Sequence, residues 1–201
     1  MNTISNILYW ISTGLLVPVI VLLIFFFIRA LILIGSFFGQ YMTEKKTAGK
    51  IYAHIDTLTN ENISDFAGKL PKKSGSLTIA YAHRIIENAG NAPKLDLLLS
   101  EYEISADKNI ATSKVLTKMG PILGLMGTLI PMGPALVGLA QGDIASMAYN
   151  MQVAFATTVV GLTVSAIGFL TQQVKERWAV KNLTMLEFIA EIVKQPNTTE
   201  K

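Results

Sequence analysis

The chain has 201 residues, of which 51% are hydrophobic and only 15% are charged, and its mean hydropathy is +0.44. Soluble domains carry about a quarter charged residues, so this composition excludes an ordinary soluble domain. The lack of Cys excludes a disulfide framework, an iron–sulfur cluster and a cysteine nucleophile. The net charge is +3, but bases and acids are interleaved without a basic stripe, so we expect no nucleic-acid partner.

Lys and Arg are confined to residues 45–118 and 175–201, apart from Arg29. A basic side chain at the centre of a bilayer costs about 2.5–3.5 kcal/mol, so long apolar stretches without one indicate membrane spans. A span needs about 20 residues at 1.5 Å each to cross the hydrocarbon core. The sequence therefore predicts three spans, at about 7–28, 119–140 and 148–170.

The spans predict four parts of the chain. Residues 1–43 are the first span with its cytoplasmic continuation, and residues 44–114 are a cytoplasmic helical segment. Residues 115–174 are a transmembrane hairpin, and residues 175–201 are a cytoplasmic amphipathic helix with its tail. Positive charge marks the cytoplasmic side. The N-terminus and the polar turn at 141–147 are therefore expected outside, and the C-terminus inside. We predict an all-α, multi-pass protein of the cytoplasmic (inner) membrane with long cytoplasmic helical extensions, anchored in the bilayer by its first span.

Several local expectations follow along the chain. Arg29 ends the first span, where it is expected to snorkel to lipid head groups, with a gating or counter-ion role as the alternative. Turn signals on either side of 77–88 predict a short helix there, and Pro93 is placed to begin a helix that continues into the second span. After the third span, apolar residues on one helical face predict an amphipathic helix: Val174, Trp178, Leu186, Ile189 and Val193.

The second and third spans carry small residues at steps of three and four. Such faces let helices approach closely in lipid, where packing drives association, so close packing is the simplest interpretation. The predicted packing residues are Gly120, Gly124, Gly127, Pro131, Ala154, Gly161 and Ser165. Three prolines in or beside the second span, Pro121, Pro131 and Pro134, remove backbone donors and favour a broken helix facing protein or a water-lined cavity.

Three threonines lie within the apolar bodies of these spans, and they are the candidate ion-pathway residues. Thr128 and Thr158 reach similar depth on antiparallel helices, and Thr157 adjoins the second of them. A buried Thr hydroxyl commonly bonds its own helix, but matched depth favours a shared polar spot. Neither span contains Asp, Glu, His, Lys or Arg. A titratable group on this path must therefore come from another chain.

Two stretches resemble the MotA/TolQ/ExbB proton-channel family. Residues 120–128 (GPILGLMGT) resemble its small-residue "LGLLGT" stretch, and residues 154–162 (AFATTVVGL) resemble its "AL-AT--GL" stretch. Close similarity covers about 114–178, and the layout of spans is similar elsewhere. With three spans, the chain is more similar to the TolQ/ExbB branch than to flagellar MotA.

The resemblance implies a homopentamer around two copies of a single-pass ExbD/TolR/MotB-like protein whose membrane Asp carries the proton. Threonines matching Thr128 and Thr158 face that Asp in the family. The chain would then be the pore-forming subunit of an ion-driven motor, such as a stator or a protein-transport energiser. It would move protons without a bound cofactor, a metal or enzymatic catalysis.

Two departures from the family pattern bear on this expectation. Val153 stands where ExbB-like members carry a Glu. Thr157 stands where proton-driven members commonly have Ala, and its additional oxygen is the ligand type that a hard cation such as Na⁺ needs. Sodium therefore remains an alternative to the proton.

Two further classes remain as alternatives. The small faces could serve only to pack a structural membrane scaffold that conducts no ion. A membrane enzyme is poorly supported, because His54 and His83 stand alone and no nucleophile–base pair or phosphate loop is present.

Overall fold

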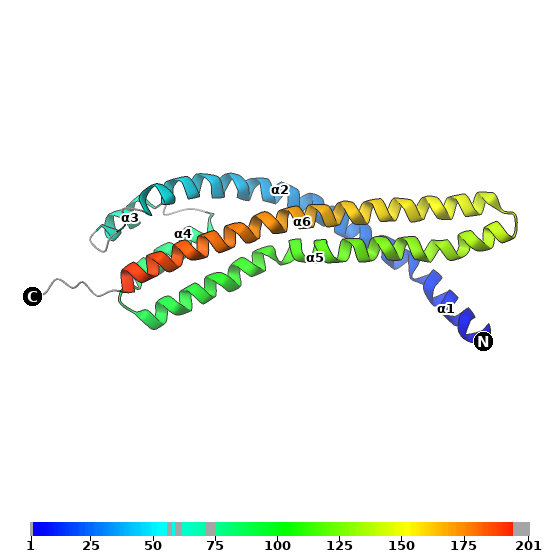
Figure 1. The fold of residues 1–201 in the computed structure, drawn as a ribbon, viewed down its shortest axis with the longest axis horizontal. Coiled ribbons are helices and arrows are strands. Elements are labelled where there is room, and N and C mark those ends of the chain that lie inside the picture. The colour runs from blue at the N-terminus through cyan, green and yellow to red at the C-terminus, as the bar shows by residue number, and fades with distance from the viewer. Residues whose placement is uncertain (1, 56–57, 59–61, 71–74, 195–201) are drawn as a thin grey trace, which may run out of the picture. The chain divides into compact units, whose positions relative to one another are not determined.

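The computed structural model describes residues 2–55, 58, 62–70 and 75–194, and these residues contain helices and no strand. The helices are α1 (Asn2–Gly14), α2 (Leu16–Ile55), α3 (Ile63–Lys69), α4 (Leu77–Glu87), α5 (Ala92–Ala140) and α6 (Ile144–Lys194) (Figure 1). Three stretches of the described chain are long and apolar enough to cross a membrane, namely Ile7–Lys45, Ala92–Ala140 and Ile144–Lys194. The all-α class and the three apolar segments are therefore confirmed.

The predicted first span is formed by two helices, because the helix is interrupted at Leu15. Pro18 has no N–H to donate to the carbonyl of Gly14, so the regular hydrogen-bond ladder cannot pass this point. The N–H of Leu15 still bonds the carbonyl of Ile11 at 3.1 Å, and that of Val19 bonds the carbonyl of Leu15 at 3.1 Å. Helix α2 then runs without interruption to Ile55.

Helices α5 and α6 both continue well beyond the apolar segments predicted from the sequence. Pro93 lies in the first turn of α5, and the helix passes through Pro121, Pro131 and Pro134 without a break. The broken helix expected from these prolines is therefore not observed. The predicted short helix at 77–88 is confirmed as α4.

The turn between α5 and α6 is shorter than predicted and covers only residues 141–143. Gly142 has a φ of 75°, which a residue without a side chain adopts at little cost. The Asp143 carboxylate accepts a hydrogen bond from the N–H of Ser146 at 3.0 Å, as an N-cap does. This cap starts α6 at Ile144, so residues 144–147 belong to the helix and not to the turn.

The chain forms two compact units. The first comprises Met1–Gly35 and Thr112–Gln172, and the second comprises Ser36–Ala111 and Gln173–Lys201. Helices α2, α5 and α6 each contribute one segment to each unit. Within the first unit, α5 and α6 form an antiparallel hairpin (Figure 1).

The first unit buries the apolar face of α2 on this hairpin. Val19 and Leu23 pack with Leu123 and Ile130 of α5. Farther along α2, Ala30 and Leu33 pack with Leu116 and Val164, and Ala30 is completely buried. Arg29 remains exposed, with its guanidinium 5.8 Å from the centroid of the Phe25 ring one turn earlier.

The second unit has its own apolar core, built from α3, α4, the first part of α5 and the last part of α6. Ile85, Leu98 and Leu186 are fully buried there. Of the apolar face predicted after the third span, Leu186, Ile189 and Val193 lie in this core, whereas Val174 and Trp178 do not. The face packs inside its own chain, since α4 and α5 supply the apolar partners.

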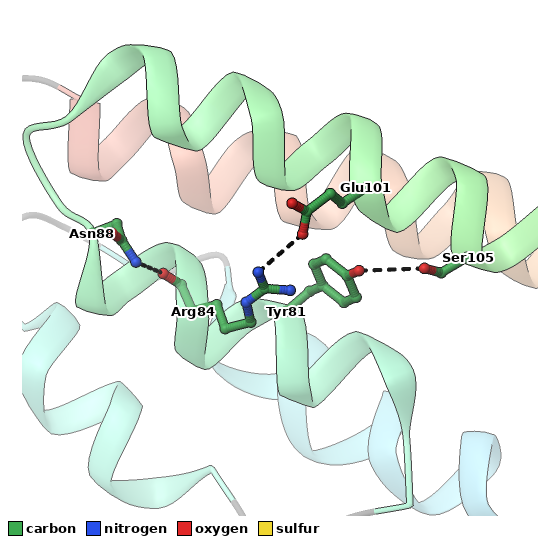
Figure 2. Close-up of polar contacts among 5 residues, drawn as sticks. All are labelled: Tyr81, Arg84, Asn88, Glu101 and Ser105. Carbon is green, nitrogen blue, oxygen red and sulfur yellow. Dashed lines mark hydrogen bonds and ion pairs between the residues drawn. The ribbon is translucent and has the colours of Figure 1, made fainter.

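Polar contacts at the edge of this core join α4 to α5 (Figure 2). The guanidinium of Arg84 pairs with the carboxylate of Glu101 at 2.9 Å, and the Tyr81 hydroxyl contacts the Ser105 hydroxyl at 3.3 Å. The Asn88 amide donates to the carbonyl of Arg84 at 2.7 Å and so helps to end α4. His83 lies on the same helix, and its buried Nε2 has no hydrogen-bond partner among the described residues.

Direct backbone contact holds α5 against α6 in the first unit. A Cβ added to Gly120 would lie 2.6 Å from the Gly161 carbonyl oxygen, and one added to Gly161 would lie 2.6 Å from the Gly120 carbonyl oxygen. At Gly168 a Cβ would lie 2.6 Å from the backbone nitrogen of Thr117. Neither helix can carry a side chain at these positions without moving away from the other.

We predict that Gly120→Ala destabilises the protein by about 1–3 kcal/mol, because the new methyl group forces α5 and α6 apart. Gly133→Ala is the matched control, since its Cβ meets only Tyr9 at an ordinary 3.9 Å and alanine favours the helix by up to about 1 kcal/mol. Thermal unfolding midpoints in detergent measure the difference. An equal midpoint for the two variants would contradict the close contact.

Candidate functional site

The hydroxyls of Thr128 on α5 and Thr158 on α6 meet across the hairpin. Their oxygens are 2.5 Å apart, at the short end of the range for a hydroxyl–hydroxyl bond. Each oxygen also lies within bonding distance of a carbonyl one turn earlier in its own helix, Gly124 at 2.9 Å and Ala154 at 3.0 Å. The two side chains of matched depth thus form one polar site.

The number of protons restricts how this pair can bond. Each threonine hydroxyl has one proton and two lone pairs, whereas the pair makes three contacts that each need a proton. One hydroxyl must therefore donate to the other, which donates to its own helix carbonyl. Both protons are then used within the chain, and only lone pairs remain for a third group. In this state the pair accepts hydrogen bonds or coordinates a cation.

Thr157 lies apart from this pair, in the interface between the two helices. Its side chain is 6% exposed, and its hydroxyl donates to the carbonyl of Val153 or Ala154, at 3.0 and 2.9 Å. A Cβ on Gly127 would lie 2.6 Å from both the Cβ and the hydroxyl oxygen of Thr157. Glycine at 127 thus provides the space that Thr157 fills. The structure brings together Thr128 and Thr158, and it does not bring Thr157 to them.

The residues predicted for packing lie between α5 and α6 or are buried in the first unit. Gly124 approaches Gly161 closely, with only 3.4 Å between its added Cβ and the Gly161 Cα. Ala154 is 1% exposed, and Pro131 is among the fully buried side chains.

Ser165 has a role that its small size alone does not reveal. Pro121 cannot donate to the carbonyl of Thr117 four residues earlier, so this carbonyl loses its usual helical partner. The Ser165 hydroxyl donates to that carbonyl at 3.0 Å from the opposite helix. This bond explains how α5 remains helical at Pro121, because a side chain replaces the missing backbone donor.

A second hydroxyl contact, between Ser113 and Thr171, was not predicted from the sequence. The Thr171 hydroxyl lies 3.1 Å from that of Ser113, and both side chains are buried. Matched depth on the two antiparallel helices could have predicted this contact, as it did for Thr128 and Thr158. Ser113 precedes the turn by about as many residues as Thr171 follows it.

The surface beside the threonine pair is apolar and exposed in the single chain. Thr128 and Thr158 are themselves half-buried. Large apolar side chains near them on both helices remain 56–64% exposed: Leu125, Leu129, Phe155, Val159 and Leu162. In a membrane protein such a surface contacts lipid or another helix, so a group from outside the chain can approach the pair.

These features define a multi-pass helical membrane protein in which a hydroxyl pair lies between two apolar spans that contain no Asp, Glu, His, Lys or Arg. The model of the MotA/TolQ/ExbB proton channel family matches residues 84–187, slightly more than half of the chain. The chain therefore belongs to this family. No curated protein sequence and no solved structure matches it.

We predict that Thr128→Val and Thr158→Val are coupled in stability, because each removes the same hydroxyl–hydroxyl bond. Double-mutant cycles on hydrogen bonds in membrane proteins give about 0.6 kcal/mol on average, so we expect about 0.5–1.5 kcal/mol here. The free energy of unfolding in mixed micelles measures this coupling.

Thr163→Val supplies the control for the cycle. Among the described residues, the Thr163 hydroxyl bonds only the carbonyl of Val159 in its own helix. The effect of Thr163→Val should therefore add to that of Thr128→Val without coupling. Strict additivity of Thr128→Val and Thr158→Val would show that the two hydroxyls do not interact.

Proposed function

We propose that this chain is the pore-forming subunit of an ion-driven motor or energiser complex. It would couple ion flow across the cytoplasmic membrane to movement of a single-pass partner. The observation that carries the proposal is the Thr128–Thr158 contact inside spans that contain no Asp, Glu, His, Lys or Arg. The proton-channel family supplies the class of activity.

The proposed assembly is a homopentamer around two transmembrane helices of an ExbD/TolR/MotB-like protein, each with an Asp at membrane depth. The N-terminus and the α5–α6 turn lie outside, and the second unit lies in the cytoplasm, as the distribution of Lys and Arg favours. The exposed apolar surface of the hairpin supports this assembly, because neighbouring chains and the partner helices would cover it.

The bonding of the threonine pair suggests how it would respond to the partner's Asp. A protonated carboxyl group donates a hydrogen bond, and the pair offers free lone pairs to accept it. An ionised carboxylate needs a donor instead. The hydroxyl that bonds its own helix would then have to rotate away from the Gly124 or Ala154 carbonyl. The two protonation states of the Asp therefore demand different hydroxyl orientations, which links proton binding to the position of the partner helix.

The placement of Thr157 favours the proton over sodium. The oxygen that could add a cation ligand is buried against Gly127, and its proton is directed to its own helix. The Thr128–Thr158 pair by itself supplies two hydroxyl oxygens, whereas hard cations require more oxygen ligands. Replacing Na⁺ with K⁺ at constant pH should accordingly leave the activity unchanged.

A structural scaffold is the second candidate, and the glycine contacts favour it. Gly120 and Gly161 are explained completely by helix packing, without any ion. The scaffold differs from the motor in two respects that can be measured, since it needs neither an Asp-bearing partner nor the hydroxyl of Thr158.

We predict that the chain, purified in mild detergent from its native cell, forms a homopentamer that retains two copies of a single-pass, Asp-bearing protein. Mass spectrometry of the intact complex measures both numbers. A stable homo-oligomer without such a partner would favour the scaffold.

We also predict that Thr158→Val lowers ion-driven activity by at least about tenfold, whereas Thr158→Ser stays near the wild-type level. Valine keeps the shape but removes the hydroxyl, and a hydrogen bond to a charged group contributes about 1.5–3 kcal/mol. Proton flux of the reconstituted complex measures this, with Thr163→Val as the control. Normal flux in an assembled Thr158→Val complex would rule out the proposed role.

A further inference from the structure

A cavity of about 400 Å³ lies in the second unit, apart from the threonine pair. Its volume is within the range of small-ligand sites. Segments of α2, α5 and α6 enclose it together with the start of α4. The polar side chains that line it include Glu44, Ser76, Thr78, Tyr102, Lys175 and Asn182.

Lys175 is a buried cation on the wall of this cavity. The residue is only 6% exposed. Among the described residues, its ammonium makes one hydrogen bond, 3.4 Å long, to the backbone carbonyl of Asn109. Burial lowers its pKa below the usual value, and no carboxylate offsets that effect. A buried charge is tolerated when it is paired, so this ammonium lacks the anion that its position calls for.

Glu44 supplies a carboxylate to the same cavity without neutralising Lys175. It accepts hydrogen bonds from the Ser76 hydroxyl at 3.4 Å and the Asn182 amide at 3.2 Å, and it pairs with no cation among the described residues. Burial, as the main cause, raises the pKa of Tyr102, so this residue also presents a neutral hydroxyl to the cavity. The cavity thus presents a cation and a carboxylate that form no ion pair with each other.

The position of the cavity along α6 fits the surface of a membrane. Lys175 follows the predicted end of the third span by five residues, about 7.5 Å along a helix, which is the depth of the head-group layer. Trp178 lies on the wall of the cavity, and its ring stacks on Phe37 at 5.6 Å and meets Tyr41 at 5.8 Å. Aromatic side chains gather at this level in membrane proteins.

We propose that the cavity binds a phosphoethanolamine group, with its phosphate at Lys175 and its ammonium at Glu44. A zwitterion of this kind supplies the missing anion and reaches the separate carboxylate at the same time. The source is either the head group of phosphatidylethanolamine or a free ethanolamine phosphate. The proposal rests on the cytoplasmic placement of the second unit but not on ion conduction.

The test uses the full-length protein in nanodiscs that contain equal amounts of phosphatidylethanolamine and phosphatidylglycerol. After transfer to detergent, native mass spectrometry counts the lipids that remain bound. We expect wild type to retain phosphatidylethanolamine about tenfold over phosphatidylglycerol, because a hydrogen bond to a charged group contributes about that factor. Lys175→Met should reduce retention of both lipids, and Glu44→Gln should remove only the preference.

Lys45→Met is the matched control, since Lys45 is exposed and does not line the cavity. Its lipid retention should equal that of wild type, which separates the cavity from general attraction between bases and phosphates. The melting temperature of delipidated Lys175→Met should equal or exceed that of wild type, because the substitution removes a buried charge. A lower value together with normal lipid retention would assign Lys175 a structural role and overturn the proposal.

A second arm adds free ethanolamine phosphate to the delipidated protein and measures its melting temperature. An increase in wild type but not in Lys175→Met, without selective lipid retention, identifies the free ester as the ligand. Selective retention identifies the lipid. If neither the lipid nor the free ester depends on Lys175, the proposal is wrong. Proton flux is not used in either arm, so these results stand independently of the proposed motor function.

Discussion

The structure of the first unit depends on the contact between the backbones of α5 and α6 at Gly120 and Gly161. Each glycine occupies space in which a Cβ would touch the opposite carbonyl oxygen at 2.6 Å. Lipid provides no hydrophobic force that draws helices together, so stability must come from such contacts. The same contact sets the distance between the threonines, because Thr128 follows Gly120 by about two turns of α5 and Thr158 precedes Gly161 by about one turn of α6. Their 2.5 Å separation is a consequence of glycine packing elsewhere in the hairpin.

The sequence predicted much of this architecture because membranes impose simple rules. The absence of Lys and Arg located the apolar segments, and equal depth placed Thr128 near Thr158. Other features depend on which atoms meet in three dimensions. The prolines predicted a broken α5, but the Ser165 hydroxyl bonds the carbonyl that Pro121 leaves without a donor, and the helix continues. A pattern along one helix cannot show what the neighbouring helix supplies.

The cavity around Lys175 illustrates the same limit in the second unit. Glu44 and Asn182 are far apart in sequence, yet the amide of one donates to the carboxylate of the other at 3.2 Å. In the sequence, Lys175 is one of several bases after the third span, where a solvated ammonium is the ordinary expectation. Only burial distinguishes it, and burial follows from the packing of α2, α5 and α6. The apolar face of the last helix was predictable from the sequence, whereas the burial of Lys175 was not.

Packing and hydroxyl chemistry are carried by different residues of this hairpin. Glycine, alanine and serine bring α5 and α6 together, and the polar groups that remain between them are mostly satisfied within the hairpin. Thr157 bonds its own helix, and Ser165 bonds the Thr117 carbonyl. Thr128 and Thr158 differ because they share two protons among three contacts and remain half-buried beside an exposed apolar surface. The two spans supply no Asp, Glu, His, Lys or Arg of their own, so the proposed ion-driven work would need a partner that supplies the acid.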